Sequence, residues 1–271
     1  MGGICKYALS AAVILTSVLL FSGGVPVRMP GGLAHPVYGA TVAENERRLL
    51  ETKKCPGCDL RRASLYRSYL VGADLTGAVL EGADLRGANL SAAMLRGANL
   101  KGARLTKSIL AGSNLRGADL SGAELTGANL RRADLNAASL RDVRMVDVQM
   151  GYADLRGADL SGTYIRDTEF GGADMSGVKL RGADLRGVDL SGVNLAGVDL
   201  NSATLRDADL SNAILTRAKM RTVDLRGTNL RGVNLQHADV VNADMRGAKG
   251  LTPAQKRYLN DRGARLTERP D

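Results

Sequence analysis

Residues 73–102 read ADLTG-AVLEG-ADLRG-ANLSA-AMLRG-ANLKG, a stretch in which every fifth residue is Leu. The same spacing continues unbroken from Leu60 to Met245, where all 38 positions hold a large apolar residue and 30 of them are Leu. Two positions before each of these, from Ala63 to Ala243, the residue is always Ala, Val, Ser or Thr. An internal repeat this regular decides the architecture before any other feature of the sequence.

A period of five fits neither a helix nor a plain strand. Five residues advance an α-helix by roughly 500°, so the apolar residues would scatter around its circumference. In a strand the side chains alternate with period two, and five is odd. The chain also contains 33 Gly residues, most of them inside the repeats. We therefore predict three-residue strands joined by two-residue corners, in which the small residue and the following Leu both point inward.

The corners carry the residues that tight turns require. The second residue after the apolar position is Gly in 21 of the 38 units. This is the third residue of a four-residue turn, where a type II turn needs positive φ. Pro56-Gly57 fits the same turn with Pro in its preferred place. A chain that turns the same way every five residues coils, and stacked coils bury the apolar columns.

These repeats resemble the pentapeptide-repeat proteins, whose motif is A(D/N)LXX, as in residues 73–77, 83–87 and 88–92. The resemblance covers residues 59–248. It implies an all-β fold, a right-handed quadrilateral β-helix with four pentapeptides per coil and short terminal capping helices. About nine and a half coils at 4.7–4.9 Å per layer would make a rod roughly 45 Å long.

Two stretches depart from the motif. Gly is absent from the corners at Ala137, Asp142, Asp147 and Tyr152, where Val143, Met145, Val148 and Met150 also enlarge the interior. We expect a local bulge or a change of turn type there. A second run without Gly spans the corners at residues 202–222.

The first 24 residues are predicted to be a signal peptide or membrane-targeting segment. Lys6 supplies the charge, and residues 8–21 form an apolar run that is short for a membrane span. We expect an exported protein of the periplasm, the thylakoid lumen or the extracellular space, with membrane contact only through this segment. An uncleaved anchor is the alternative. No Cys stands directly after the run, which argues against a lipoprotein.

The remaining flanks are predicted from composition. Residues 25–40 contain three Pro among Gly and are expected to be a linker. Residues 41–58 form an N-terminal cap with the Cys pair, because solenoid ends need covers. Residues 249–271 form a C-terminal capping helix and tail that starts at Thr252-Pro253. The alternative is that this last helix forms a homodimer contact.

The charge of the repeats argues against DNA mimicry. Relatives that inhibit or protect DNA gyrase resemble a duplex through strongly acidic faces, and this function is implied only by the resemblance. Residues 59–248 contain 25 basic and 22 acidic residues, a net charge of +3. A nearly neutral rod does not reproduce the phosphate field of a duplex. Topoisomerase binding is therefore a disfavoured alternative.

One column of basic residues is the candidate interaction face. Residues 20 apart should stack if four units make a coil, which aligns Arg166, Arg186, Arg206, Arg226 and Arg246. The column could hold an acidic polymer or an anionic membrane surface. However, Asp184, Asp224 and Asp244 lie two residues from three of these arginines, so interleaved ion pairs on a solvated face are favoured. No aromatic residues interleave for base stacking, and we expect no nucleic-acid partner.

Cys55 and Cys58 are the only redox or metal constellation. Both fall on inward positions of the repeat register, on one turn whose ends lie close enough for a disulfide. A structural disulfide or buried thiol pair is favoured; a thioredoxin-like redox pair and a metal or cofactor site remain as alternatives. By resemblance, a leader that ends in Cys-x-x-Cys-Asp-Leu opens the repeats of cyanobacterial relatives and supports export.

We predict no enzyme, catalytic residue, cofactor or metal site. His35 and His237 have no fixed nucleophile beside them, and the many Asp residues before the Leu positions diverge to different faces, whereas Ca²⁺ needs converging oxygens. The predicted function is a rigid structural or protein-interaction scaffold for an unidentified protein partner. The alternative from another class is thiol–disulfide exchange through Cys55 and Cys58.

Overall fold

The computed structural model describes residues 26–28, 34–36 and 40–266, which fall into two compact units. In the first unit, Met1–Thr41, strand β1 (Pro26–Arg28) pairs antiparallel with β2 (Ala34–Pro36). The segment that we predicted as a linker therefore contains a short strand pair. The predicted signal segment, residues 1–24, lies outside the described residues.

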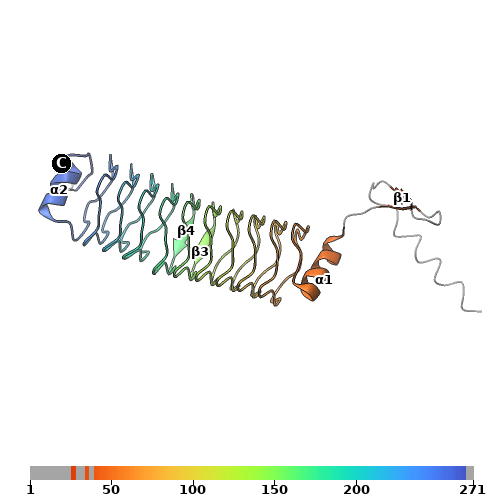
Figure 1. Cartoon of the computed structure of the whole chain (residues 1–271). Helices are drawn as coiled ribbons and strands as arrows, with labels where there is room; N and C mark the ends of the chain where they lie inside the picture. The colour runs from red at the N-terminus through yellow and green to blue at the C-terminus, as the bar shows by residue number, and fades with distance from the viewer. Residues whose placement is uncertain (1–25, 29–33, 37–39, 267–271) are drawn as a thin grey trace, which may run out of the picture. The chain divides into compact units, whose positions relative to one another are not determined.

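The second unit, Val42–Asp271, is a coiled rod with one helix at each end (Figure 1). Helix α1 (Val42–Thr52) precedes the first coil, and α2 (Pro253–Asn260) follows the last. Outward residues 20 positions apart form parallel bridges, such as Lys54 with Asp74. Four pentapeptides therefore make one coil, and the fold is the right-handed quadrilateral β-helix that the repeats predict. Bridging extends to strands only at β3 (Arg144–Val146), which pairs parallel with β4 (Tyr164–Arg166), among the described residues of the rod.

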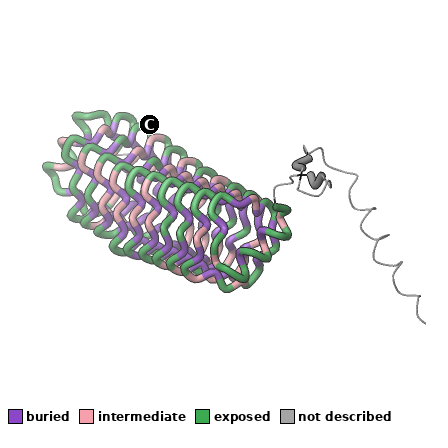
Figure 2. The backbone as a smooth tube through the Cα atoms, turned by 45° about the vertical axis from the view of Figure 1, so that its right-hand side comes forward, coloured by how far each residue is buried: buried purple, intermediate pink, exposed green. Residues whose placement is uncertain are grey.

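The apolar columns fill the interior of the rod. Every fifth residue from Leu60 to Met245 is at most 5% exposed, and buried positions recur at the same place in coil after coil (Figure 2). The hydroxyls in the small inward positions are satisfied locally: Ser108 and Ser113 each donate to the Leu carbonyl three residues earlier at 2.7 Å. Thr168 is the exception, because its hydroxyl donates instead to the Arg166 carbonyl at 3.0 Å, so each of these buried hydroxyls has a backbone acceptor nearby.

The corners follow one rule irrespective of residue type. From residue 62 to residue 247, the second corner residue has positive φ in every unit, whether or not it is Gly. In most corners the next N–H donates to the preceding Leu carbonyl, as from Ala63 to Leu60 at 3.1 Å. This is the turn predicted from the sequence.

The expected change of turn type occurs at one of the predicted corners and also at the corner stacked on it, which was not predicted. At residues 146–147 and 166–167 a bend replaces the hydrogen-bonded turn, immediately after β3 and β4. The corners at residues 137, 142 and 152 keep the ordinary turn, as do those at 202–222. The absence of Gly alone therefore does not alter a corner.

Thr222 occupies a corner that favours Gly, and Thr222→Gly is expected to raise stability by about 0.5–1 kcal/mol. Its φ is +54°, and a β-branched residue is strained in that region. The check is chemical denaturation of both proteins. Gly187→Thr is the matched reverse change, because a Cβ there meets no atom within 4 Å. It should destabilise the rod, and an unchanged midpoint in both variants would contradict the strain argument.

Both ends of the rod are covered. Under the first coil, Leu49 of α1 is fully buried and Asn45 Nδ2 donates to the Asp59 carbonyl at 3.0 Å. At the other end Thr252 and Gln255 form a capping box at the start of α2. The chain then returns, and Arg265 bridges Asp244 of the last coil. In the part of the chain that the structure describes, no helix has the length and apolar character to cross a membrane.

Candidate functional site

The five predicted arginines lie along one edge of the rod, and we call Arg166, Arg186, Arg206, Arg226 and Arg246 the arginine ladder. The bridges that run from Tyr164 through Asp184, Thr204 and Asp224 to Asp244 stack their coils in register. Each ladder arginine is the first residue of a corner, two positions after one of these bridged residues. The backbone therefore brings the ladder together as the 20-residue spacing predicts.

Asp184 is held between two ladder arginines. Its Oδ1 accepts from Arg186 Nε at 2.9 Å, and its Oδ2 accepts at 2.7 Å from both Arg186 Nη2 and Arg166 Nη2. The Arg166 side chain is only 19% exposed. Its guanidinium also lies over the ring of Tyr164, 4.3 Å from the centroid. Tyr164 was not predicted from the sequence, although its position 20 residues before Asp184 places it in the same column.

The same pattern repeats farther along the ladder. Asp224 accepts from Arg206 Nε at 2.5 Å and from Arg226 Nη2 at 2.8 Å. Asp244 accepts from Arg246 Nε at 2.9 Å, with Arg226 Nε at 3.7 Å. Each ladder arginine therefore contacts a carboxylate, which is the interleaved arrangement favoured from the sequence. Five guanidinium groups thus pair with three aspartates, and Asp167 and Asp207 follow Arg166 and Arg206 directly on the same corners.

These contacts shift the acidity of the aspartates. The side-chain hydrogen bond from Arg186, followed by that from Arg166, holds the pKa of Asp184 well below its ordinary value. Arg246 lowers the pKa of Asp244 in the same way. Near the first coil, the hydrogen bond from Arg61 lowers the pKa of Asp59 from 3.8 to about 2. Asp184 and Asp244 are thus ionised throughout the neutral range.

Lowered carboxylate pKa values make the rod sensitive to acid. Each affected Asp has a lower pKa in the folded than in the unfolded chain, so its stabilising contribution is complete above about pH 4 and is lost as the pH falls towards the folded value. The melting temperature should therefore fall between pH 4 and pH 2. In Asp184→Asn the melting temperature should fall less steeply between pH 4 and pH 2. The same pH dependence in the variant and the wild type would show that Asp184 does not contribute to the acid sensitivity.

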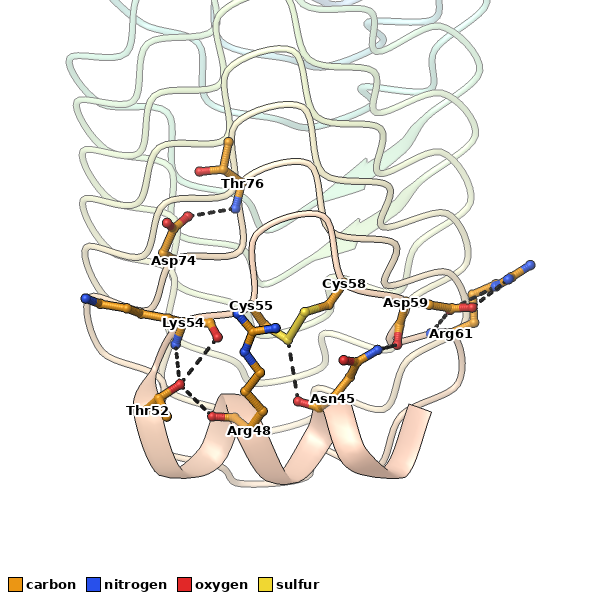
Figure 3. Close-up of a disulfide and its surroundings, with 10 residues drawn as sticks. All are labelled: Asn45, Arg48, Thr52, Lys54, Cys55, Cys58, Asp59, Arg61, Asp74 and Thr76. Atoms are coloured by element: carbon orange, nitrogen blue, oxygen red, sulfur yellow. Dashed lines mark hydrogen bonds and ion pairs between the residues drawn. A yellow bond between two sulfur atoms is a disulfide. The ribbon is translucent and has the colours of Figure 1, made fainter. Parts of the chain in front are cut away.

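Cys55 and Cys58 are joined in the structure at the base of the first coil, next to α1 (Figure 3). Their Cα atoms are 5.3 Å apart. Cys55 is fully buried and Cys58 is 8% exposed. Cys55 Sγ lies 3.5 Å from the carbonyl oxygen of Asn45 in α1. The pair therefore closes the core beneath the cap, and an attacking thiolate has little access to it.

Removal of the disulfide should loosen this end of the rod. A cross-link that closes a loop this short is worth about 2 kcal/mol in the chain-entropy model. We expect Cys55→Ser/Cys58→Ser to lower the free energy of unfolding by about that amount, measured by denaturant titration. Wild-type protein treated with reductant after partial denaturation should reach the same value; equal stability of oxidised protein and the double variant would contradict a structural role.

The described residues contain no cluster of three His, Cys, Asp or Glu side chains able to hold a metal. His237 lines a largely apolar hollow of about 830 Å³ between the last coil and α2, together with Tyr258 and Arg262. A second cavity of about 480 Å³ lies on one side of the rod near Glu169 and Asp189. Neither hollow was predicted from the sequence.

The geometry defines a quadrilateral β-helix with charged outer walls. A family model described as pentapeptide repeats matches eight segments between residues 54 and 249, and the chain belongs to this family. No curated protein matches the chain by sequence comparison.

Three solved structures are similar to this chain to different degrees. HetL, a pentapeptide repeat protein involved in heterocyst differentiation regulation from the cyanobacterium Nostoc sp. strain PCC 7120, is 29% identical, with 79% of this chain and 99% of that chain covered and a TM-score of 0.45. A trypsin-treated variant of QnrB1, a plasmid-mediated fluoroquinolone resistance protein, is 18% identical, with coverages of 77% and 94% and a TM-score of 0.56. A pentapeptide repeat protein from the Arabidopsis thaliana thylakoid lumen is 21% identical, with coverages of 62% and 81% and a TM-score of 0.16. The likeness to QnrB1 shows the fold.

Proposed function

We propose that the protein is a non-enzymatic scaffold that presents its outer walls, and the arginine ladder first among them, to a protein partner after export. The observation that carries this proposal is the fixed register of the ladder. Backbone bridges hold its five arginines in successive coils. Asp184, Asp224 and Asp244 each contact two of the guanidinium groups and so hold them in place before a partner binds. Preorganised side chains lose little entropy on binding.

The charge balance of the ladder indicates the chemistry of the partner. Five arginines share three aspartates, and the Arg186 and Arg206 side chains are 54% and 45% exposed. Their guanidinium groups are therefore partly accessible to a partner. A partner that offers carboxylates or carbonyl oxygens at the spacing of the coils would pair with them, because arginine binds such groups with a fixed fork of donors.

Two rival functions receive less support. Thiol–disulfide exchange requires access to sulfur, whereas Cys55 and Cys58 are buried beneath α1. Topoisomerase binding by duplex mimicry requires a strongly acidic surface, whereas residues 59–248 have a net charge of +3. Export rests on the composition of residues 1–24 and on the resemblance stated above.

The partner surface is tested by affinity capture with the full chain. Wild-type protein is compared with Arg186→Glu/Arg206→Glu, and the retained proteins are identified by mass spectrometry. Lys179→Glu/Lys219→Glu is the matched control, because it makes the same change of charge on another wall. We expect loss of a specific partner only with the ladder variant. If all three proteins retained the partner equally, the ladder would not be the binding surface. If none of them retained a specific partner, the scaffold proposal would be wrong.

A further inference from the structure

One wall of the rod is interrupted between two successive coils. The wall whose middle residues include Gln149, Glu169, Asp189 and Asp209 has a bridge at each step except that between Glu169 and Asp189. Within residues 54–249 this is the single place where middle residues 20 apart are not bridged. We call this gap, between residues 167–172 and residues 187–191, the seam.

Backbone hydrogen bonds that recur elsewhere on this wall are missing at the seam. Three coils earlier, Leu110 donates to Asn129 O at 2.7 Å and Gly112 donates to Arg131 O at 2.9 Å. The equivalent N–H groups of Phe170 and Gly172 make no backbone hydrogen bond in the described structure, and neither does that of Asp189. The cavity of about 480 Å³ occupies this position, lined on one side by Glu169 and Phe170 and on the other by Val188 and Asp189.

The interior explains why the coils separate here. Phe170 is fully buried and is the one aromatic residue among the inward positions of the repeats. In the neighbouring inward column, Val148, Thr168 and Val188 follow one another, where the coils before and after have Ala128 and Ala208. Overfilling a packed core displaces the backbone. The enlarged side chains therefore hold this wall apart.

The other three walls keep their backbone bridges across the seam. Ile165 donates to Asp184 O at 2.9 Å and Met175 donates to Asn194 O at 3.1 Å on the two adjoining walls. On the opposite wall, Leu160 donates to Lys179 O at 2.7 Å. The bonds on the opposite wall can act as a hinge while the open wall changes its width.

An ion pair ties Glu169, on the N-terminal side of the seam, to the coils that precede it. Arg131 Nη2 reaches Glu169 Oε2 at 3.1 Å, two coils away. It passes Gly151, where a Cβ would lie 3.3 Å from Arg131 Nε. Glu169 is thus tied to the coils below it and not to Asp189 above it.

We propose that the seam is a built-in joint, at which the rod bends by widening the wall that carries Glu169 and Asp189. The rod then consists of two rigid blocks, residues 42–173 and residues 186–266, which residues 174–185 connect. The arginine ladder crosses the joint between Arg166 and Arg186, so bending would change the spacing of these two guanidinium groups. The test of the joint measures the motion of the blocks and does not depend on the proposed scaffold function.

The joint is tested by electron–electron distance measurements between nitroxide labels on the full chain with Cys5→Ser. The pair Gln149→Cys/Asp209→Cys spans the seam. The pair Asn89→Cys/Gln149→Cys is the control, three coils apart on the same wall without the seam. We expect a distance distribution about twice as wide for the spanning pair. Equal widths would overturn the proposal.

Two further measurements connect the motion to its cause. Amides of residues 167–172 should exchange hydrogen about tenfold or more faster than those of residues 107–112. Phe170→Leu should narrow the spanning distribution and slow this exchange, because it removes the excess volume; Val188→Ala provides the same test if Phe170→Leu fails to fold. Widths and exchange rates unchanged in a folded variant would show that overfilling does not open the seam.

Discussion

Leu120→Asp is expected to destroy the cooperative fold of the rod. Leu120 is fully buried in the middle of the apolar columns, and its backbone is bonded to Ser139 in the next coil. The change removes a packed side chain and places a carboxylate where no cation or donor can reach it. The expected loss exceeds about 4 kcal/mol. Circular dichroism and denaturant titration provide the measurement.

The effect should spread beyond the altered coil. The backbone bridges of each coil go only to its two neighbours, so the stability of a solenoid is approximately the sum of the stabilities of its repeats and of the contacts between neighbouring coils. A coil that no longer stacks divides the rod into two shorter arrays, each with an uncovered end. Thr126→Asp is the control, because this residue lies at an outward corner position. If Leu120→Asp were tolerated as well as Thr126→Asp, the columns would not form the core.

Most of the fold could be predicted from the repeat because each of its five positions has a fixed place, either inward, outward or in a corner. A period of five permits only an inward pair and a corner, so burial at Leu60 through Met245 and positive φ at the corners follow from the sequence. The stacking of the ladder followed from the 20-residue period. The pairing of Asp184 with both Arg166 and Arg186 was within reach, because alternation of charge along a column is visible in the sequence.

The seam was not predictable in the same way. It results from several modest increases in volume that lie 20 residues apart, at residues 148, 168, 170 and 188, and it depends on how the stacked coils share that excess. The sequence indicated an enlarged interior around residues 143–150, and the structure places the lost hydrogen bonds one coil later. Phe170 was the available signal, because it breaks a series of Leu and Met.

Gly250→Ala is expected to detach the C-terminal cap. Gly250 has φ +81°, and a Cβ there would lie 2.6 Å from both the Cα and the N of Arg231. Backbone atoms cannot move aside as a flexible side chain can, so residues 249–251 would have to lift from the last coil. That movement breaks the hydrogen bond from Leu230 N to Lys249 O and exposes Leu251 and Leu259, which are 8% and 0% exposed in the structure.

The strain and the lost contacts together should lower the free energy of unfolding by about 2–5 kcal/mol. Hydrogen exchange should localise the damage to α2 and the last coil. Gly247→Ala is the matched control: Gly247 has φ +70°, but its added Cβ would meet Gly227 N at an ordinary 3.7 Å. It therefore carries the cost of positive φ without the clash. If the two variants lost the same stability, the close approach to Arg231 would contribute nothing, and positive φ alone would explain why Gly stands at the end of the rod.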